Sequence, residues 1–147
     1  MRAVKLILAL RKGARPTKLD PADPSKTIPD DTVTVIDLKS SPIRVLATLH
    51  AGKGPSGVSI NPAGTLALVA NRNEGTVSVF AIDGTRVTPV GKVDLGDPNC
   101  TPSLPVFTPD GRRAFVTRNG DHKVSELAIE PAGVRYTKRH LSAHLRP

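Results

Sequence analysis

The sequence repeats itself at a distance of 47 residues, and this repeat limits the fold more than any other feature. GTVSVFAI begins at residue 75 and the similar HKVSELAI begins at residue 122, which sets the distance (122 minus 75). The match extends upstream, where NPAG at 61–64 corresponds to TPDG at 108–111 and LALV at 66–69 corresponds to RAFV at 113–116. A repeat of this length indicates one supersecondary unit, used more than once, that buries its apolar faces against its neighbours.

Each repeat unit is predicted to contain four short strands joined by tight turns. The sequence x-Pro-x-Gly lies between the second and third strands, where proline presets the first turn dihedral and glycine accepts the positive one. The first complete unit is expected over 45–82, with strands at 45–49, 56–60, 65–70 and 76–82. The second is expected over 90–129, with strands at 90–95, 103–107, 112–117 and 123–129.

The third strand of the unit carries apolar side chains on both faces, since Leu66 and Leu68 alternate with Ala67 and Val69. A sheet with one face in water would alternate apolar with polar residues, so this sheet must be covered on both sides. The sequence offers no helical segment as a cover, and the next copy of the sheet is the natural one. We therefore predict an all-β fold, a β-propeller fragment of four-stranded antiparallel blades.

The stretch GKGPSGVSINPAGTLALVANRNEGTVSVF, from residue 52, resembles the YVTN-type repeat of lactonase-like propellers. The shared features are a Gly-Pro entry, a Pro-x-Gly turn, a strand that ends in Val-Ala-Asn, and Gly-Thr-Val-Ser-Val. The resemblance covers about 32–129 and is looser in the second unit, where Val-Ala-Asn becomes Val-Thr-Arg at 116–118. It implies a seven-bladed propeller, and it specifies fold better than chemistry.

The two ends of the chain are expected to form partial blades. Residues 1–38 hold the third and fourth strands of one blade, separated by a proline-rich insertion at 11–31 that is expected to be a long surface loop. Residues 134–147 are expected to start a further blade. Seven blades of this repeat would need about 330 residues. The chain is therefore interpreted either as a fragment of a longer gene product or as a protomer that self-associates through its open blade faces.

The net charge of +8 is concentrated towards the two termini, with six bases and no acid in residues 1–18. With only three Phe, one Tyr and no Trp, the chain lacks the stacking aromatics of a nucleic-acid surface, so a nucleic-acid partner is not expected.

No apolar run is long enough for a transmembrane helix. The family resemblance implies a periplasmic or secreted location. However, Arg11, Lys12 and Arg15 stand where a signal peptide should have a cleavage site, so the compartment is left open.

One end of the blades is the better candidate for a ligand face. In an antiparallel meander, the connections from the first to the second strand and from the third to the fourth lie at the same end. That end gathers polar side chains, and binding residues concentrate on loops held by a rigid scaffold. The candidate ligand-face residues are His50, Lys53, Asn71, Arg72, Glu74, Arg118, Asn119, Asp121 and His122. The ligand or protein that binds there is left unidentified.

Within this set, Arg72 and Arg118 are expected to hold a carboxylate or phosphate through paired donors. His50 and His122 are general-base candidates that would need an orienting carboxylate, and exposed histidine is the simpler interpretation of both.

His140 and His144 have a helix-like spacing for a metal but no third ligand, so no metal site is predicted. Cys100 is the single cysteine, which excludes an internal disulfide. No nucleophile elbow, phosphate loop or haem motif is present, so no cofactor is predicted and the catalytic residues are left unassigned.

Two functions follow from these observations. The first is a non-catalytic propeller segment that acts as a binding or interaction scaffold, because a clear repeat stands beside absent catalytic motifs. The second is implied by the resemblance: part of a lactonase-like hydrolase acting on a lactone or sugar lactone. There, a histidine or carboxylate at the loop-rich end would activate water and an arginine would stabilise the oxyanion. The chain on its own is expected to be inactive.

Overall fold

The computed structural model describes residues 6–10, 19–20, 23–27 and 31–142, and every regular element in these ranges is a β-strand. The first sheet contains β1 (Leu6–Leu10), β4 (Thr32–Asp37) and β5 (Arg44–His50), in the order β1-β4-β5. The middle sheet contains β6 (Pro55–Ile60), β7 (Leu66–Asn71), β8 (Thr76–Asp83) and β9 (Arg86–Asp94). The last sheet contains β10 (Pro102–Phe107), β11 (Arg113–Arg118), β12 (Lys123–Glu130) and β13 (Gly133–Ser142). The predicted all-β fold is confirmed.

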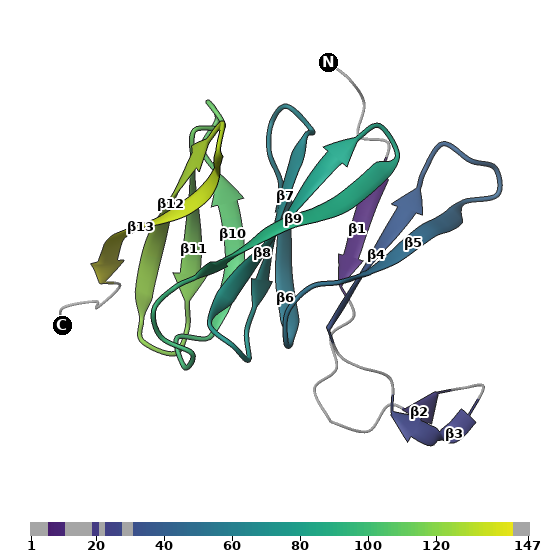
Figure 1. The fold of residues 1–147 in the computed structure, drawn as a ribbon, viewed down its shortest axis with the longest axis horizontal. Coiled ribbons are helices and arrows are strands. Elements are labelled where there is room, and N and C mark those ends of the chain that lie inside the picture. The colour runs from purple at the N-terminus through teal and green to yellow at the C-terminus, as the bar shows by residue number, and fades with distance from the viewer. Residues whose placement is uncertain (1–5, 11–18, 21–22, 28–30, 143–147) are drawn as a thin grey trace, which may run out of the picture.

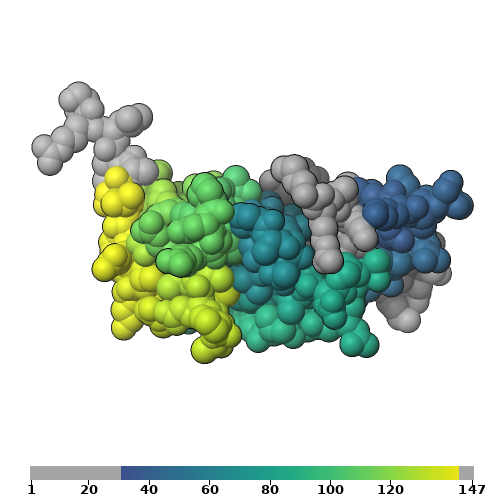
Figure 2. Space-filling view, turned by 90° about the horizontal axis from the view of Figure 1, so that it is seen from above, coloured from purple at the N-terminus to yellow at the C-terminus, as the bar shows by residue number. Residues whose placement is uncertain are grey.

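The three sheets stand face to face in a row, and each is an antiparallel meander (Figure 1). Figure 2 shows the row from above, with the first sheet in blue at one end and the last sheet in green and yellow at the other. The first strand of the middle sheet, β6, lies against the first strand of the last sheet, β10, and we call these the leading strands. The last strand of the middle sheet, β9, lies between β5 and β13. This stack of one three-stranded and two four-stranded antiparallel sheets is the arrangement of propeller blades.

The core lies between the sheets, in two apolar layers. Val33 and Val35 of the first sheet pack with Phe80 on one side of the middle sheet. Leu68 packs with Val116 in the layer between the middle and last sheets. Strand β7 is consequently buried on both faces, as its two-sided apolar pattern predicts. The residues of the core are almost all aliphatic, which is why so few aromatics suffice.

The boundaries of the sheets differ from the predicted units 45–82 and 90–129. Strand β5 pairs with β4 rather than with β6. The strand predicted to open each unit therefore belongs to the preceding sheet. The physical reason is the length of the connections. β8 and β9 are joined by a two-residue hairpin in which Asp83 pairs with Arg86, whereas the connection from β9 to β10 spans 95–101. The hydrogen-bonded sheets therefore run over 55–94 and 102–142.

The two ends of the chain also differ from expectation. Strand β1 pairs antiparallel with β4, as the partial blade requires. However, the insertion at 11–31 contains a small hairpin of β2 (Leu19–Asp20) and β3 (Asp23–Thr27) rather than loop alone, and the rest of the insertion before residue 31 lies outside the described residues. Strand β13 pairs with β12 and completes the last sheet, so it does not start a further blade. In the described ranges, no helix has the length and hydrophobicity needed to cross a membrane.

Candidate functional site

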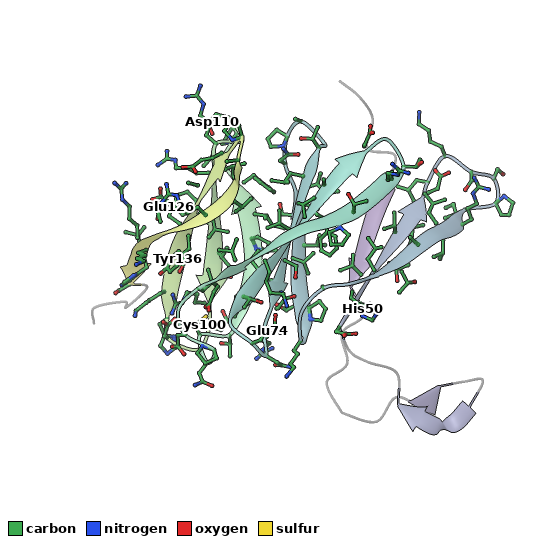
Figure 3. All side chains as sticks on the ribbon, viewed as in Figure 1. His50, Glu74, Cys100, Asp110, Glu126 and Tyr136 are labelled. Carbon is green, nitrogen blue, oxygen red and sulfur yellow. The ribbon has the colours of Figure 1, made fainter. Side chains whose placement is uncertain are left out.

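Four connections lie at one end of the row of sheets, and we call this the loop end. They are 51–54, 72–75, 95–101 and 119–122. Figure 3 shows the labelled His50, Glu74 and Cys100 at this end, with Asp110 at the opposite end. The nine predicted ligand-face residues all lie in these connections or at the strand ends beside them.

Asn71 is fully buried and holds two connections together. Its Oδ1 accepts a hydrogen bond from the backbone N–H of Gly52 at 3.0 Å, and its Nδ2 donates to Thr76 at 3.0 Å and to Ser78 at 2.9 Å. The side chain is thus used inside the protein, because buried polar groups need partners of this kind. Asn71 thus holds the turns 51–54 and 72–75 together from inside the protein.

Glu74 lies in the same turn, and its carboxylate binds the ammonium group of Lys92. Its carboxylate accepts hydrogen bonds from Thr76 at 2.5 Å and from Lys92 Nζ at 2.8 Å, and also from the backbone N–H of Lys53. Partial burial acts to raise the pKa of this carboxyl, but the bonds from Lys92 and Thr76 outweigh it, and the pKa lies below its usual value. Glu74 is therefore ionised and structurally engaged.

Arg118 occupies the position of Asn71 one repeat later, and it does the same work with more bonds. The guanidinium is 5% exposed and donates to both carboxylate oxygens of Asp121. It also donates to Ser125 at 3.1 Å, to the Leu95 carbonyl at 3.4 Å and to the Tyr136 hydroxyl at 3.4 Å. Burial opposes the charge, but Asp121 outweighs it and raises the pKa of the guanidinium. Arg118, which was expected to hold a ligand together with Arg72, therefore already donates its hydrogen bonds to groups of the protein.

The remaining candidates are exposed. Arg72, Lys53 and Asn119 lie on the surface of the turns. The side chain of His50 is 78% exposed, and its Nδ1 lies 3.4 Å from a carboxylate oxygen of Asp31. His122 is exposed as well and has a φ of 54°, at the repeat position that Gly75 fills with a φ of 68°.

A groove of about 420 Å³ opens at the loop end between the middle and last sheets. Its walls are the segment 94–97, the cluster of Arg118 and Asp121, and residues of β12 and β13. Strand β13 contributes Tyr136, Lys138 and His140. Sequence reasoning missed Tyr136 and Lys138 and considered His140 only as a metal candidate, because it assigned this segment to a further blade. The Glu130-Pro-Ala-Gly133 turn, a hairpin signal, could have placed them beside β12.

The lining of the groove carries side chains of both charges. Lys123 Nζ lies 3.5 Å from Asp121, which already binds Arg118. Cys100, buried in the neighbouring connection, has its thiol pKa raised by burial, which disfavours a reactive thiolate. Across the described part of the chain, no group of three or more His, Cys, Asp or Glu side chains is placed to hold a metal ion. The groove therefore presents polar groups of both charges to solvent.

No protein-family model and no curated protein matches the chain. Among solved structures, it is similar to a candidate 6-phosphogluconolactonase of Bacteroides fragilis, with 18% identity and a TM-score of 0.65 over 76% of this chain and 33% of that one. The periplasmic gluconolactonase of Pseudomonas aeruginosa gives 23% identity and a TM-score of 0.62 over 76% and 35%. A protein of Lactobacillus plantarum gives 20% identity and a TM-score of 0.66 over 89% and 44%.

At these identities the similarity concerns the fold, because function depends on the residues of a site rather than on the architecture. The chain spans less than half the length of each of these three structures. Over most of its length, it has the fold of the lactonase-like seven-bladed β-propellers.

Proposed function

We propose that the chain acts as a non-catalytic binding scaffold and that the groove at the loop end receives a small polar ligand. The groove is the observation that carries this proposal. It combines acceptors on the 94–97 segment with the cations Lys123 and Lys138 and the ring of Tyr136. A concave site with a few convergent polar groups is the usual form of a ligand site.

The state of the candidate acids and bases supports binding over catalysis. Glu74, Arg118 and Asp121 are bonded to groups of the protein itself, so their removal would disturb the turns before it affected any substrate. A general base needs a free acceptor directed at the substrate proton. Rigid turns of this kind serve instead to keep a groove in shape.

Binding can be measured by NMR chemical-shift perturbation of the whole chain against a panel of gluconate, inorganic phosphate, amino acids and gluconolactone. We expect at least one compound to shift the resonances of Lys138 and Tyr136, and Lys138→Ala to weaken binding about tenfold, which corresponds to about 1.4 kcal/mol. Arg112→Ala, an exposed cation at the opposite end, is the matched control and should leave binding unchanged. Shifts confined to other faces, or no binding at all, would contradict the proposal.

A second function, lactone hydrolysis, is favoured by one observation. The Nδ1 of His50 lies 3.4 Å from Asp31, and a carboxylate in this position can orient an imidazole that activates water. The exposed Arg72 would then stabilise the oxyanion. Two of the similar proteins are a candidate 6-phosphogluconolactonase and a gluconolactonase. Turnover of gluconolactone above buffer that His50→Ala abolishes would favour this function, and equal rates with and without the chain would reject it.

A further inference from the structure

The first and last sheets each have one face without a described sheet against it, and both faces carry exposed apolar side chains. On the first sheet, Val45 of β5 is 60% exposed, and Ile43 in the connection just before β5 is 63% exposed. On the last sheet, Val106 and Leu141 are 50% and 68% exposed, and Leu104 is 47% exposed although its Cδ1 lies beside Gly57 of the middle sheet. Figure 2 shows these sheets at opposite ends of the row, so the two faces point away from each other. Exposed apolar patches of this kind mark interaction sites.

The open face of the last sheet repeats the covered face of the middle sheet. Leu141 pairs with Val124 in the last sheet, just as Val93 pairs with Val77 in the middle sheet. Val77 is fully buried and Val93 is 7% exposed, because the last sheet covers them. By register, the open face therefore has the pattern of a surface that receives another sheet.

The open face of the first sheet has the pattern of the other surface in that interface, which is the face of the last sheet that packs on the middle sheet. Ile36 pairs with Val45, in the register by which Leu127 pairs with Tyr136 in the last sheet. Leu127 is fully buried against the middle sheet, and Tyr136 packs on the same cluster. The two open faces are thus the two halves of the interface between the middle and last sheets.

The leading strands decide which sheet can cover the last one. A Cβ added at Gly57 of β6 would lie 2.2 Å from the backbone oxygen of Ser103, so β6 and β10 approach closely only because residue 57 is glycine. Leu104 occupies the equivalent position in β10. A further sheet with a leading strand like β10 would collide with Leu104. Among the described strands of the first sheet, none lies beyond the free edge of β1, where the other two sheets have their leading strand.

We propose that the open face of the last sheet packs against the open face of the first sheet in a second copy of this chain. The contact is heterologous, so repeated copies form a closed ring if the rotation allows it and an open chain otherwise. Three residues weaken the fit: Glu126, Arg113 and Thr117 stand at the positions of Val79, Leu66 and Ala70, which are apolar and buried or partly buried in the middle sheet.

Sedimentation velocity over a range of protein concentrations tests this contact. The wild-type chain should gain mass with concentration, and Val45→Asp or Leu141→Asp should each leave it monomeric. A one-to-one mixture of these two variants should form a heterodimer and nothing larger, because each supplies the face that the other has lost. Val90→Asp is the matched control, since Val90 is 59% exposed on β9 of the middle sheet and belongs to neither face. Circular dichroism of each variant confirms that it is folded.

Three further outcomes are decisive. Glu126→Val restores the apolar residue of the middle sheet and should strengthen association about tenfold, because a carboxylate is costly to bury without a partner. Failure of this variant to strengthen association would oppose the assignment of the face. A wild-type chain that stays monomeric at every concentration would overturn the proposal. A Val45→Asp variant that still dimerises would also overturn it, because the last sheets would then pair with each other.

Discussion

Gly57→Ala should destabilise the chain, although alanine is the smallest change that can be made at this position. Gly57 is buried in β6 and has an ordinary strand backbone, so the substitution introduces no left-handed strain. The new Cβ would lie 2.2 Å from the Ser103 oxygen and 3.1 Å from the Leu104 Cα. Both are backbone atoms that cannot rotate away, so β10 must retreat by about 1 Å to regain ordinary van der Waals contact.

Overpacking of this kind costs about 1–3 kcal/mol. In a chain of this size, each kcal/mol lowers the melting temperature by about 2–4 °C. Urea unfolding followed by far-UV circular dichroism, at one fixed protein concentration, measures the loss. Gly91→Ala is the matched control: Gly91 is also a strand glycine, but no atom lies within 4 Å of its added Cβ. That variant should match the wild type or gain about 0.4–1 kcal/mol from the reduced freedom of the unfolded chain. Equal stability of the two variants would refute the close contact between the sheets.

The other predictions concern the turns of the loop end. Asn71→Ala removes three hydrogen bonds and leaves the buried Gly52 N–H and Ser78 hydroxyl without partners, which should cost about 2–4 kcal/mol by the same urea assay. Asn119→Ala, at an exposed turn position, should change stability by less than about 0.5 kcal/mol, and a similar loss in both variants would speak against the role of Asn71. The folded-state pKa of Glu74 is lowered. The contribution of this carboxylate to the free energy of unfolding is therefore present above the ordinary carboxyl pKa and is lost as the pH falls through the folded-state pKa. Stability should therefore fall below about pH 5, less steeply in Glu74→Gln, and parallel profiles would contradict this assignment.

The strand positions were predictable from the sequence because their two signals are local. Alternation of apolar residues marked each strand, and proline or glycine marked each turn, so the observed strand β8 at Thr76–Asp83 lies within one residue of the prediction at 76–82. The assignment of strands to sheets depends on hydrogen bonds between segments, and an apolar strand such as β5 has two sequence neighbours that it could join. The Asp83-Gly84 turn carried the deciding information, since Asp-Gly at this position favours a tight hairpin and so pairs β8 with β9.

The sequence predicts where the polar turn residues lie but not what they do. Polar residues beside the turns lie at the loop end, as the meander requires, but the sequence does not distinguish a polar side chain that faces the ligand from one that satisfies a buried backbone group. Asn71 and Arg118 belong to the second kind. Whether Lys53, Arg72, Asn119 or His122 contacts a ligand stays a prediction.

The single thiol of the chain lies where the middle and last sheets meet, and Cys100 is fully buried there. Alkylating reagents can reach its sulfur only when the 95–101 connection lifts away from the 119–122 turn, to which Cys100 is tied by a backbone bond from Gly120 at 3.0 Å. The rate of labelling under native conditions therefore reports how often this joint opens, without any engineered probe. Cells that expose the chain to oxidants would modify this sulfur mainly in molecules whose last sheet has come loose.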